Sequence, residues 1–136
     1  MSSRRVAAPL AGNVLGTPEN DFVIAEWQDA GGPPGPPRWI APLHLHRNDD
    51  EAWYVLEGAP CVKMRDEEVE LRAGSAVLVA RGTPHTYWNS GPERVRYLLV
   101  MTSRIYRLIQ EIHVTKERTP EIMRALFEKF DSELLG

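Results

Sequence analysis

The stretch that decides the fold reads Pro42-Leu43-His44-Leu45-His46-Arg47-Asn48-Asp49-Asp50-Glu51, and its counterpart later in the chain reads Gly82-Thr83-Pro84-His85-Thr86-Tyr87-Trp88-Asn89. On a helix, two residues separated by two positions point roughly 200° apart, so His44 and His46 could not bind the same ion. On a strand they leave the same face, with Cα atoms about 7 Å apart. The first stretch therefore predicts a strand that presents two imidazoles to one metal ion.

Two further ligands can reach the same point. A polar turn at residues 47–50 separates His46 from a run with strand composition, and a hairpin there can return Glu51 to the side of the histidines. Gly82 supplies a second turn, after which His85 begins a short aromatic strand. The sequence therefore predicts one metal site inside a closed sheet, formed by His44, His46, Glu51 and His85.

Three imidazoles and one carboxylate form an N₃O ligand set. This set suits one divalent transition metal, namely Fe, Mn, Ni, Cu or Zn, and the sequence does not choose among them. Four protein ligands on an octahedral ion leave two positions for water, substrate or O₂, as in catalytic rather than structural sites. Glu51 has an alternative role beside the metal, as a desolvated carboxylate that moves protons.

Alternation along the predicted strands also suggests the walls of a substrate pocket. Apolar and aromatic walls would hold a small organic molecule and exclude bulk water, although each residue could equally be ordinary filling of the sheet interior. Tyr87 shares the face of His85, so we take Tyr87 and Glu51 as candidate catalytic residues. The expected wall consists of Trp53, Val55, Val77, Val79 and Tyr87.

The bulk properties exclude several classes of function. A chain of 136 residues fits one domain, and a net charge of −3 with a pI near 5.8 gives no electrostatic reason to bind nucleic acid or an anionic membrane. No signal peptide and no apolar run of about 20 residues is visible. A lone cysteine, Cys61, cannot form an internal disulfide, and a reduced cytoplasmic location is expected.

The chain divides into three parts. Residues 1–37 read as an arm or short edge strand, then a strand over 22–27 and a Gly/Pro-rich loop. Residues 38–102 are expected to be all β, and residues 103–136 are expected to form a helical tail with caps at Ser103 and Thr119. The strands of the middle part are predicted at 38–46, 51–57, 60–65, 68–72, 76–80, 85–89 and 94–101. The second tail helix has an apolar face that must pack on the sheets or on another subunit, formed by Ile122, Met123, Leu126, Phe127, Phe130 and Leu134.

The two stretches resemble the motifs of the cupin superfamily. The first family motif is His-x-His, three or four residues, Glu, six residues, Gly, and it is matched here by His44, His46, Glu51 and Gly58. The second is Gly, five residues, Pro-x-Gly, two residues, His, three residues, Asn, and it is matched by Gly74, Gly82, His85 and Asn89, with alanine in place of the proline. The resemblance implies an all-β, jelly-roll barrel, and small cupins of this size are often homodimers.

The resemblance also orders the functional hypotheses. The signature of Pro42, the two histidines, Asp50-Glu51 and Tyr54-Val55-Leu56 is similar to small quercetin-dioxygenase-like cupins. It implies a metal-dependent dioxygenase acting on a small organic substrate, with Glu51 as proton acceptor. One alternative is a non-redox isomerase, lyase or cyclase that uses the metal as a Lewis acid. The other is a binding module without catalysis.

Overall fold

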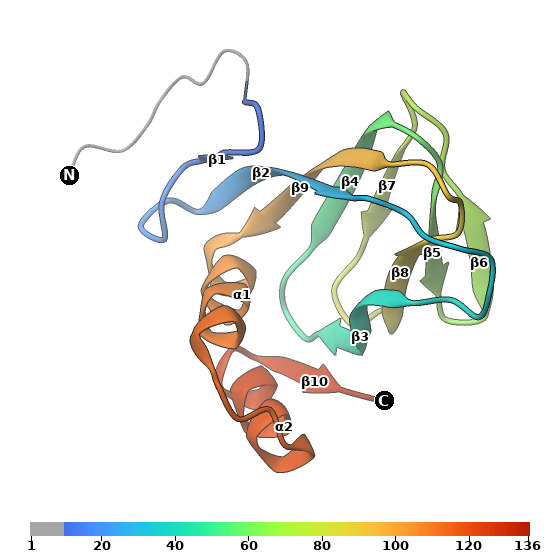
Figure 1. Cartoon of the computed structure of the whole chain (residues 1–136). Coiled ribbons are helices and arrows are strands. Elements are labelled where there is room, and N and C mark those ends of the chain that lie inside the picture. Colours follow the sequence, from blue (N-terminus) through green and yellow to red (C-terminus); the bar gives the residue numbers. More distant parts are fainter. Residues whose placement is uncertain (1–9) are drawn as a thin grey trace.

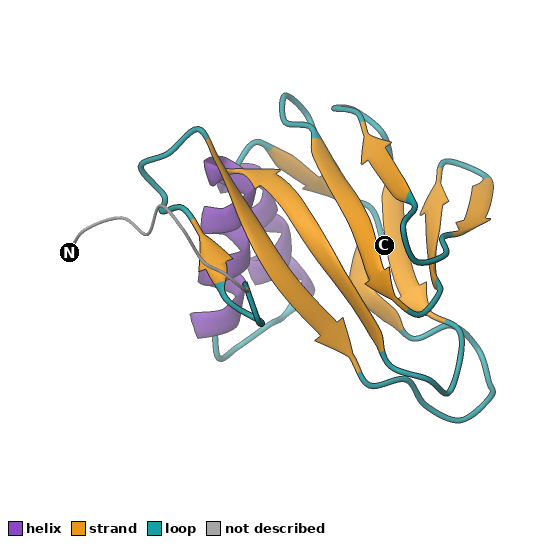
Figure 2. Cartoon of the chain, turned by 90° about the horizontal axis from the view of Figure 1, so that it is seen from above, coloured by secondary structure: helices purple, strands orange, loops and turns teal. Residues whose placement is uncertain are grey.

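A computed structural model describes residues 10–136, so the first nine residues of the predicted N-terminal arm lie outside the described part. The described chain is a sandwich of two antiparallel sheets with two helices gathered at one end of the strands (Figures 1 and 2). The elements are β1 (Val14–Leu15), β2 (Phe22–Asp29), β3 (Trp39–His46), β4 (Glu51–Glu57), β5 (Pro60–Met64), β6 (Glu67–Glu70), β7 (Ala76–Val79), β8 (His85–Asn89), β9 (Val95–Thr102), α1 (Ser103–Val114), α2 (Pro120–Lys129) and β10 (Ser132–Leu134).

The predicted all-β, jelly-roll class is confirmed, but the sheets do not close into a barrel. One sheet has the strand order β1-β2-β9-β4-β7 and the other β10-β3-β8-β5-β6, and no pairing among the described strands joins the two. Side chains alternate along β9, where Val95, Tyr97, Leu99 and Met101 are buried and the residues between them are partly exposed. This period of two buries one face of each sheet and forms the core between them.

The end of the chain differs from the prediction. The second tail helix was expected to carry its apolar face as far as Leu134, but α2 ends at Lys129. Asp131 then adopts a positive φ of 57°, which turns the chain, and Ser132–Leu134 pairs with β3 as strand β10. Three residues are too few to show a strand period, so the apolar spacing alone favoured a longer helix.

The helix caps are partly as predicted. Thr119 caps α2 by accepting a hydrogen bond from the Ile122 amide, and Pro120 occupies the first turn. At α1 the expected cap, Ser103, is wrong: the Thr102 hydroxyl accepts from the Ile105 amide instead. Thr102 is the last residue of β9 and still has an extended backbone, which is the conformation that a cap residue requires.

The helical tail packs on the sheets of its own chain. Phe127 of α2 is only 2% exposed and its ring lies edge-on to the His44 ring, with 5.4 Å between ring centroids. The tail therefore closes one end of the space between the two sheets. Within residues 10–136, neither helix has the length and apolar character needed to cross a bilayer.

Candidate metal centre

The four predicted ligands meet between the two sheets. His44 and His46 lie on β3 and His85 on β8, and the two strands are neighbours in register at His44 and His85. Glu51 comes from the opposite sheet, at the start of β4. All four side chains are buried, and one ligand atom from each lies within 4.8 Å of the others. The strand alternation and the hairpin turn thus bring an N₃O set to one point.

The outer nitrogen of each imidazole is held by a protein oxygen. Nδ1 of His44 lies 2.6 Å from the Pro42 carbonyl, and Nδ1 of His85 lies 2.8 Å from the Thr83 carbonyl. A carbonyl can only accept, so both Nδ1 atoms carry the proton. Nδ1 of His46 lies 2.7 Å from the hydroxyl of Ser132. This arrangement fixes the ring orientations and leaves the three Nε2 atoms for the centre, as in metal-binding histidines.

Glu51 bridges the inner nitrogens of two histidines. Its Oε1 lies 2.6 Å from Nε2 of His85 and 3.2 Å from Nε2 of His46. The Nε2 atom of His46 is not aligned for a hydrogen bond. Burial alone would raise the pKa of the Glu51 carboxyl, but the contacts with His46 and His85 outweigh burial and lower it. Burial and the neighbouring His85 and His46 lower the pKa of His44 to about 3. The ionised Glu51 carboxylate lies among three imidazoles, and the inner nitrogen of His46 has no hydrogen-bond partner among the described residues. This set of donor atoms fits a divalent transition metal.

These buried groups predict that acid destabilises the metal-free protein. The folded state keeps His44 neutral down to about pH 3, whereas the unfolded chain protonates it near 6.5, so stability is lost as pH falls below 6.5. The lowered pKa of Glu51 acts in the same direction below its ordinary value of 4.5. For chelator-treated protein, we expect the free energy of unfolding, measured with urea, to fall by on the order of 2 kcal/mol between pH 7 and about pH 4.5. A His113→Ala variant should show the same dependence, and a flat profile would contradict the prediction.

A cavity of about 450 Å³ extends from the four-residue cluster toward the tail. Its walls are aromatic on the sheet side and aliphatic on the helix side. The aromatic wall includes Trp53 and Tyr87, two of the residues expected to line a substrate pocket, together with Trp27 and Tyr97, which were not among them. The aliphatic wall comes from the tail and includes Ile105, Leu108, Ile109, Ile112, Met123 and Phe127.

The other predicted wall residues do not line this cavity. Val77 and Val79 lie on β7, the edge strand on the far side of β4, whereas the cavity opens toward β9 and β2. Val55 faces inward but lies farther along β4 from Glu51 than Trp53 does, and it is fully buried in the core. Alternation identified the correct face of these strands but not the direction in which the cavity extends.

The two cavity tyrosines form a hydrogen-bonded pair. Their hydroxyl oxygens are 2.9 Å apart, and both side chains are buried. Burial raises the pKa of Tyr87 well above its ordinary value and that of Tyr97 to about 12. Both phenols therefore stay protonated near neutral pH. Since one hydroxyl proton is used within the pair, the other can be donated to a molecule in the cavity.

Ser132 completes the site and was not predicted. Its side chain is fully buried, and its Oγ accepts from His46 while donating to the Phe130 carbonyl at 3.1 Å. The residue lies 86 positions from His46 in the sequence, on the short strand β10, so neither spacing nor composition indicates the contact. The last strand of the tail thus orients His46, one of the four candidate metal ligands.

We expect Ser132→Ala to lower metal affinity about tenfold without unfolding the protein. Without the hydroxyl, His46 no longer has an acceptor that fixes Nδ1 as the protonated nitrogen, and a proton on Nε2 competes with the metal. Competition titration with a chromophoric chelator measures the change. Ser90→Ala, in an exposed loop, is the matched control and should bind metal as the unchanged protein does. Equal affinities of the two variants would show that the hydroxyl has no such role.

The tail also holds the turn between His46 and Glu51. The polar turn at residues 47–50 is not simply exposed to solvent, because Asp49 is only 6% exposed and lies 3.2 Å from the Arg104 guanidinium of α1. Asn48 donates to the Asp131 carboxylate at 2.6 Å, and the same carboxylate pairs with Arg104 at 3.0 Å. These contacts tie the ligand-bearing hairpin to both ends of the tail.

Comparisons with known proteins agree with this geometry. Residues 36–101 match the family described as the cupin domain. An uncharacterized protein of Methanocaldococcus jannaschii is 33% identical over 49 residues, which are 36% of this chain and 39% of that protein. The chain therefore covers well under two thirds of that curated relative.

Solved structures show the same fold. A cupin protein from Bacteroides fragilis is 16% identical with a TM-score of 0.53, and the alignment covers 61% of this chain and 66% of the other. A sugar phosphate isomerase of the cupin superfamily from Silicibacter pomeroyi is 21% identical with a TM-score of 0.52, covering 61% of this chain and 51% of the other. The motifs, the sandwich and the family match agree, and residues 36–101 of this chain are a cupin domain.

Proposed function

We propose that this protein binds one divalent transition metal through His44, His46, Glu51 and His85 and acts on a small organic molecule in the adjoining cavity. The observation that carries the proposal is the cluster itself. Four buried ligand atoms lie within 4.8 Å of one another, and three of the four residues, His44, His46 and Glu51, line a cavity of about 450 Å³. A buried cluster of titratable groups beside a cavity, with the inner nitrogen of His46 left without a hydrogen-bond partner in the described part of the chain, is typical of a functional site.

Each of the chain's own groups has a distinct task in this proposal. A metal held there supplies Lewis-acid or redox chemistry to a substrate oxygen when bound. The lowered pKa of Glu51 makes it a weak proton acceptor and favours its role as a ligand over that of a general base. The raised pKa values of Tyr87 and Tyr97 make the pair a hydrogen-bond donor toward a substrate oxygen. The aromatic and aliphatic walls exclude water and hold the apolar part of the substrate.

Dioxygenase chemistry is the first candidate reaction. Its support is the resemblance to small quercetin-dioxygenase-like cupins, together with cavity walls suited to an apolar or aromatic molecule. The second candidate is non-redox isomerisation, because a structural neighbour is a sugar phosphate isomerase. The apolar lining favours the first candidate, since a sugar phosphate would leave many hydroxyl groups without partners in such a cavity.

Metal analysis joined to activity measurement tests the proposal. Protein purified without chelator is analysed for metal and then loaded separately with Fe, Mn, Ni, Cu and Zn. Oxygen uptake on enediol and flavonoid-like compounds that depends on a redox-active metal supports the dioxygenase. Turnover with zinc under anaerobic conditions supports the isomerase or lyase. Tight metal binding with no turnover by any form would reduce the role to ligand binding.

A further inference from the structure

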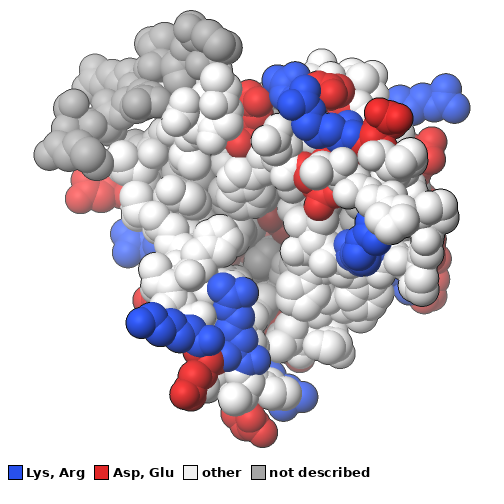
Figure 3. Space-filling model, viewed as in Figure 1, with Lys and Arg blue, Asp and Glu red and all other residues white. Residues whose placement is uncertain are grey.

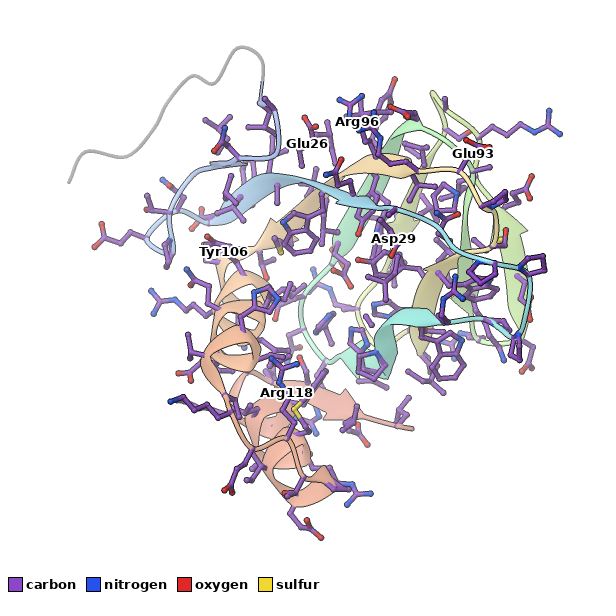
Figure 4. The ribbon with its side chains drawn as sticks, in the orientation of Figure 1. Glu26, Asp29, Glu93, Arg96, Tyr106 and Arg118 are labelled. Carbon is purple, nitrogen blue, oxygen red and sulfur yellow. The ribbon has the colours of Figure 1, made fainter. Side chains whose placement is uncertain are left out.

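The cavity has a cationic group at its tail end. Arg118, in the connection between α1 and α2, is one of the residues that line it, and Figure 4 shows Arg118 between these helices. The space-filling view in Figure 3 shows a hollow in this face of the molecule with basic side chains along its edge. Among the described residues that line the cavity, the only acid is Glu51 of the metal cluster.

Arg118 also lacks a carboxylate partner. Its Nε donates to the Thr115 carbonyl at 3.2 Å, which anchors the side chain and leaves both terminal nitrogens available. Within residues 10–136, no Asp or Glu oxygen lies within 4 Å of its guanidinium. Five described arginines are ion-paired at this distance, namely Arg47, Arg81, Arg94, Arg96 and Arg104. Arg107 and Arg124 have no such pair with a described residue either, and Arg118 differs from them in lining the cavity. An anchored guanidinium without a counter-charge, placed on a cavity, can bind a carboxylate or a phosphoryl group in a two-pronged manner.

We propose that the cavity takes a small organic acid whose anionic group binds Arg118 and whose apolar body lies between the aromatic and aliphatic walls. The inference rests on the proposed function in one respect: it assumes that the reacting end of the substrate faces the metal cluster. The charge at one end and the cluster at the other set the orientation of the molecule. Apolar walls between them exclude a polyhydroxylated anion and select a compound with an aromatic or aliphatic body.

Matched pairs of probes test this assignment. Phenylacetate and benzoate are compared with their neutral amides, phenylacetamide and benzamide, which have nearly the same shape. Dissociation constants are measured by ligand-observed NMR on zinc-loaded protein and again on chelator-treated protein, because a bound ion attracts carboxylates itself. In both forms the unchanged protein is expected to bind each acid about tenfold more tightly than its amide.

The variants locate the source of that preference. Arg118→Gln should remove the tenfold preference in the chelator-treated protein, and Arg118→Lys should keep part of it. Arg124→Gln, an exposed arginine of α2 outside the cavity lining, is the matched control and should behave as the unchanged protein. An unchanged preference in Arg118→Gln overturns the inference, as does the absence of acid binding at probe concentrations of about 10 mM.

Metal content of the same samples separates this inference from the proposed function. Normal zinc binding without an Arg118-dependent preference refutes the anion site and leaves the metal centre intact. An Arg118-dependent preference in a protein that binds no metal supports the anion site and refutes the metal-dependent function.

Discussion

Replacing His46 by alanine is expected to lower the affinity for a divalent metal about 100-fold or more while the protein stays folded. His46 is the ligand with the most complete support, since its ring is 3% exposed, its outer nitrogen is bound to Ser132 and its inner nitrogen has no hydrogen-bond partner. Removing the group that is hydrogen-bonded to the outer nitrogen of a metal-binding histidine lowers metal affinity about 10- to 100-fold. Removing the histidine itself should therefore lower metal affinity further. The fold should survive, because the buried core between the sheets has its own apolar contacts apart from the four ligands.

The matched control for this experiment is the fourth histidine. His113 lies at the end of α1, outside the four-residue cluster, so His113→Ala should retain full metal content. Both variants are loaded with the same metal, dialysed and analysed by mass spectrometry for bound metal, with near-ultraviolet circular dichroism as the check of folding. A folded His46→Ala protein that keeps its metal would remove His46 from the ligand set. Equal loss in both variants would mean that the effect is not local to the cluster.

The strand part of this fold is readable from the sequence because its signals are local. The spacing of His44 and His46 requires a period of two, and the turn glycine Gly82 has the positive φ of 80° that such a turn favours. The predicted strands agree with β2 to β9 within a few residues at their ends. The same local signals explain why the four cluster residues lie together. Strand alternation places the histidine side chains on one face, and the hairpin turn brings Glu51 back beside them.

The remaining parts of the site depend on contacts between distant segments. Strand β10 has three residues and exists because it adds to the edge of β3, and nothing in its own sequence requires it. The contact of Ser132 with His46 follows from that pairing. The cavity likewise depends on where the tail packs. Its aliphatic wall comes from the two tail helices. The apolar stripe of a helix can pack in a core, in a subunit interface or along a pocket, and only the position of the helices in the fold decides which.

Replacing Phe127 by alanine is expected to destabilise the protein by about 3–5 kcal/mol and to weaken metal binding as well. The ring is 2% exposed, contacts His44 and forms part of the cavity wall. Removing it enlarges a space that is already present, so the surroundings cannot easily collapse to fill it. The same helix leads into Ser132, which orients His46, so loosening of α2 is expected to reach the metal site. Urea unfolding and chelator competition measure the two effects.

Phe22 provides a control of the same residue type, because its side chain is 59% exposed on β2. Phe22→Ala should change the free energy of unfolding by less than about 0.5 kcal/mol and leave metal affinity unchanged. If Phe127→Ala loses stability but keeps full metal affinity, the tail stabilises the fold without positioning the ligands. If neither quantity changes, the tail does not pack on the sheets as described, and the cavity loses its aliphatic wall. A joint loss confined to Phe127→Ala would establish that the last segment of the chain holds the metal centre together.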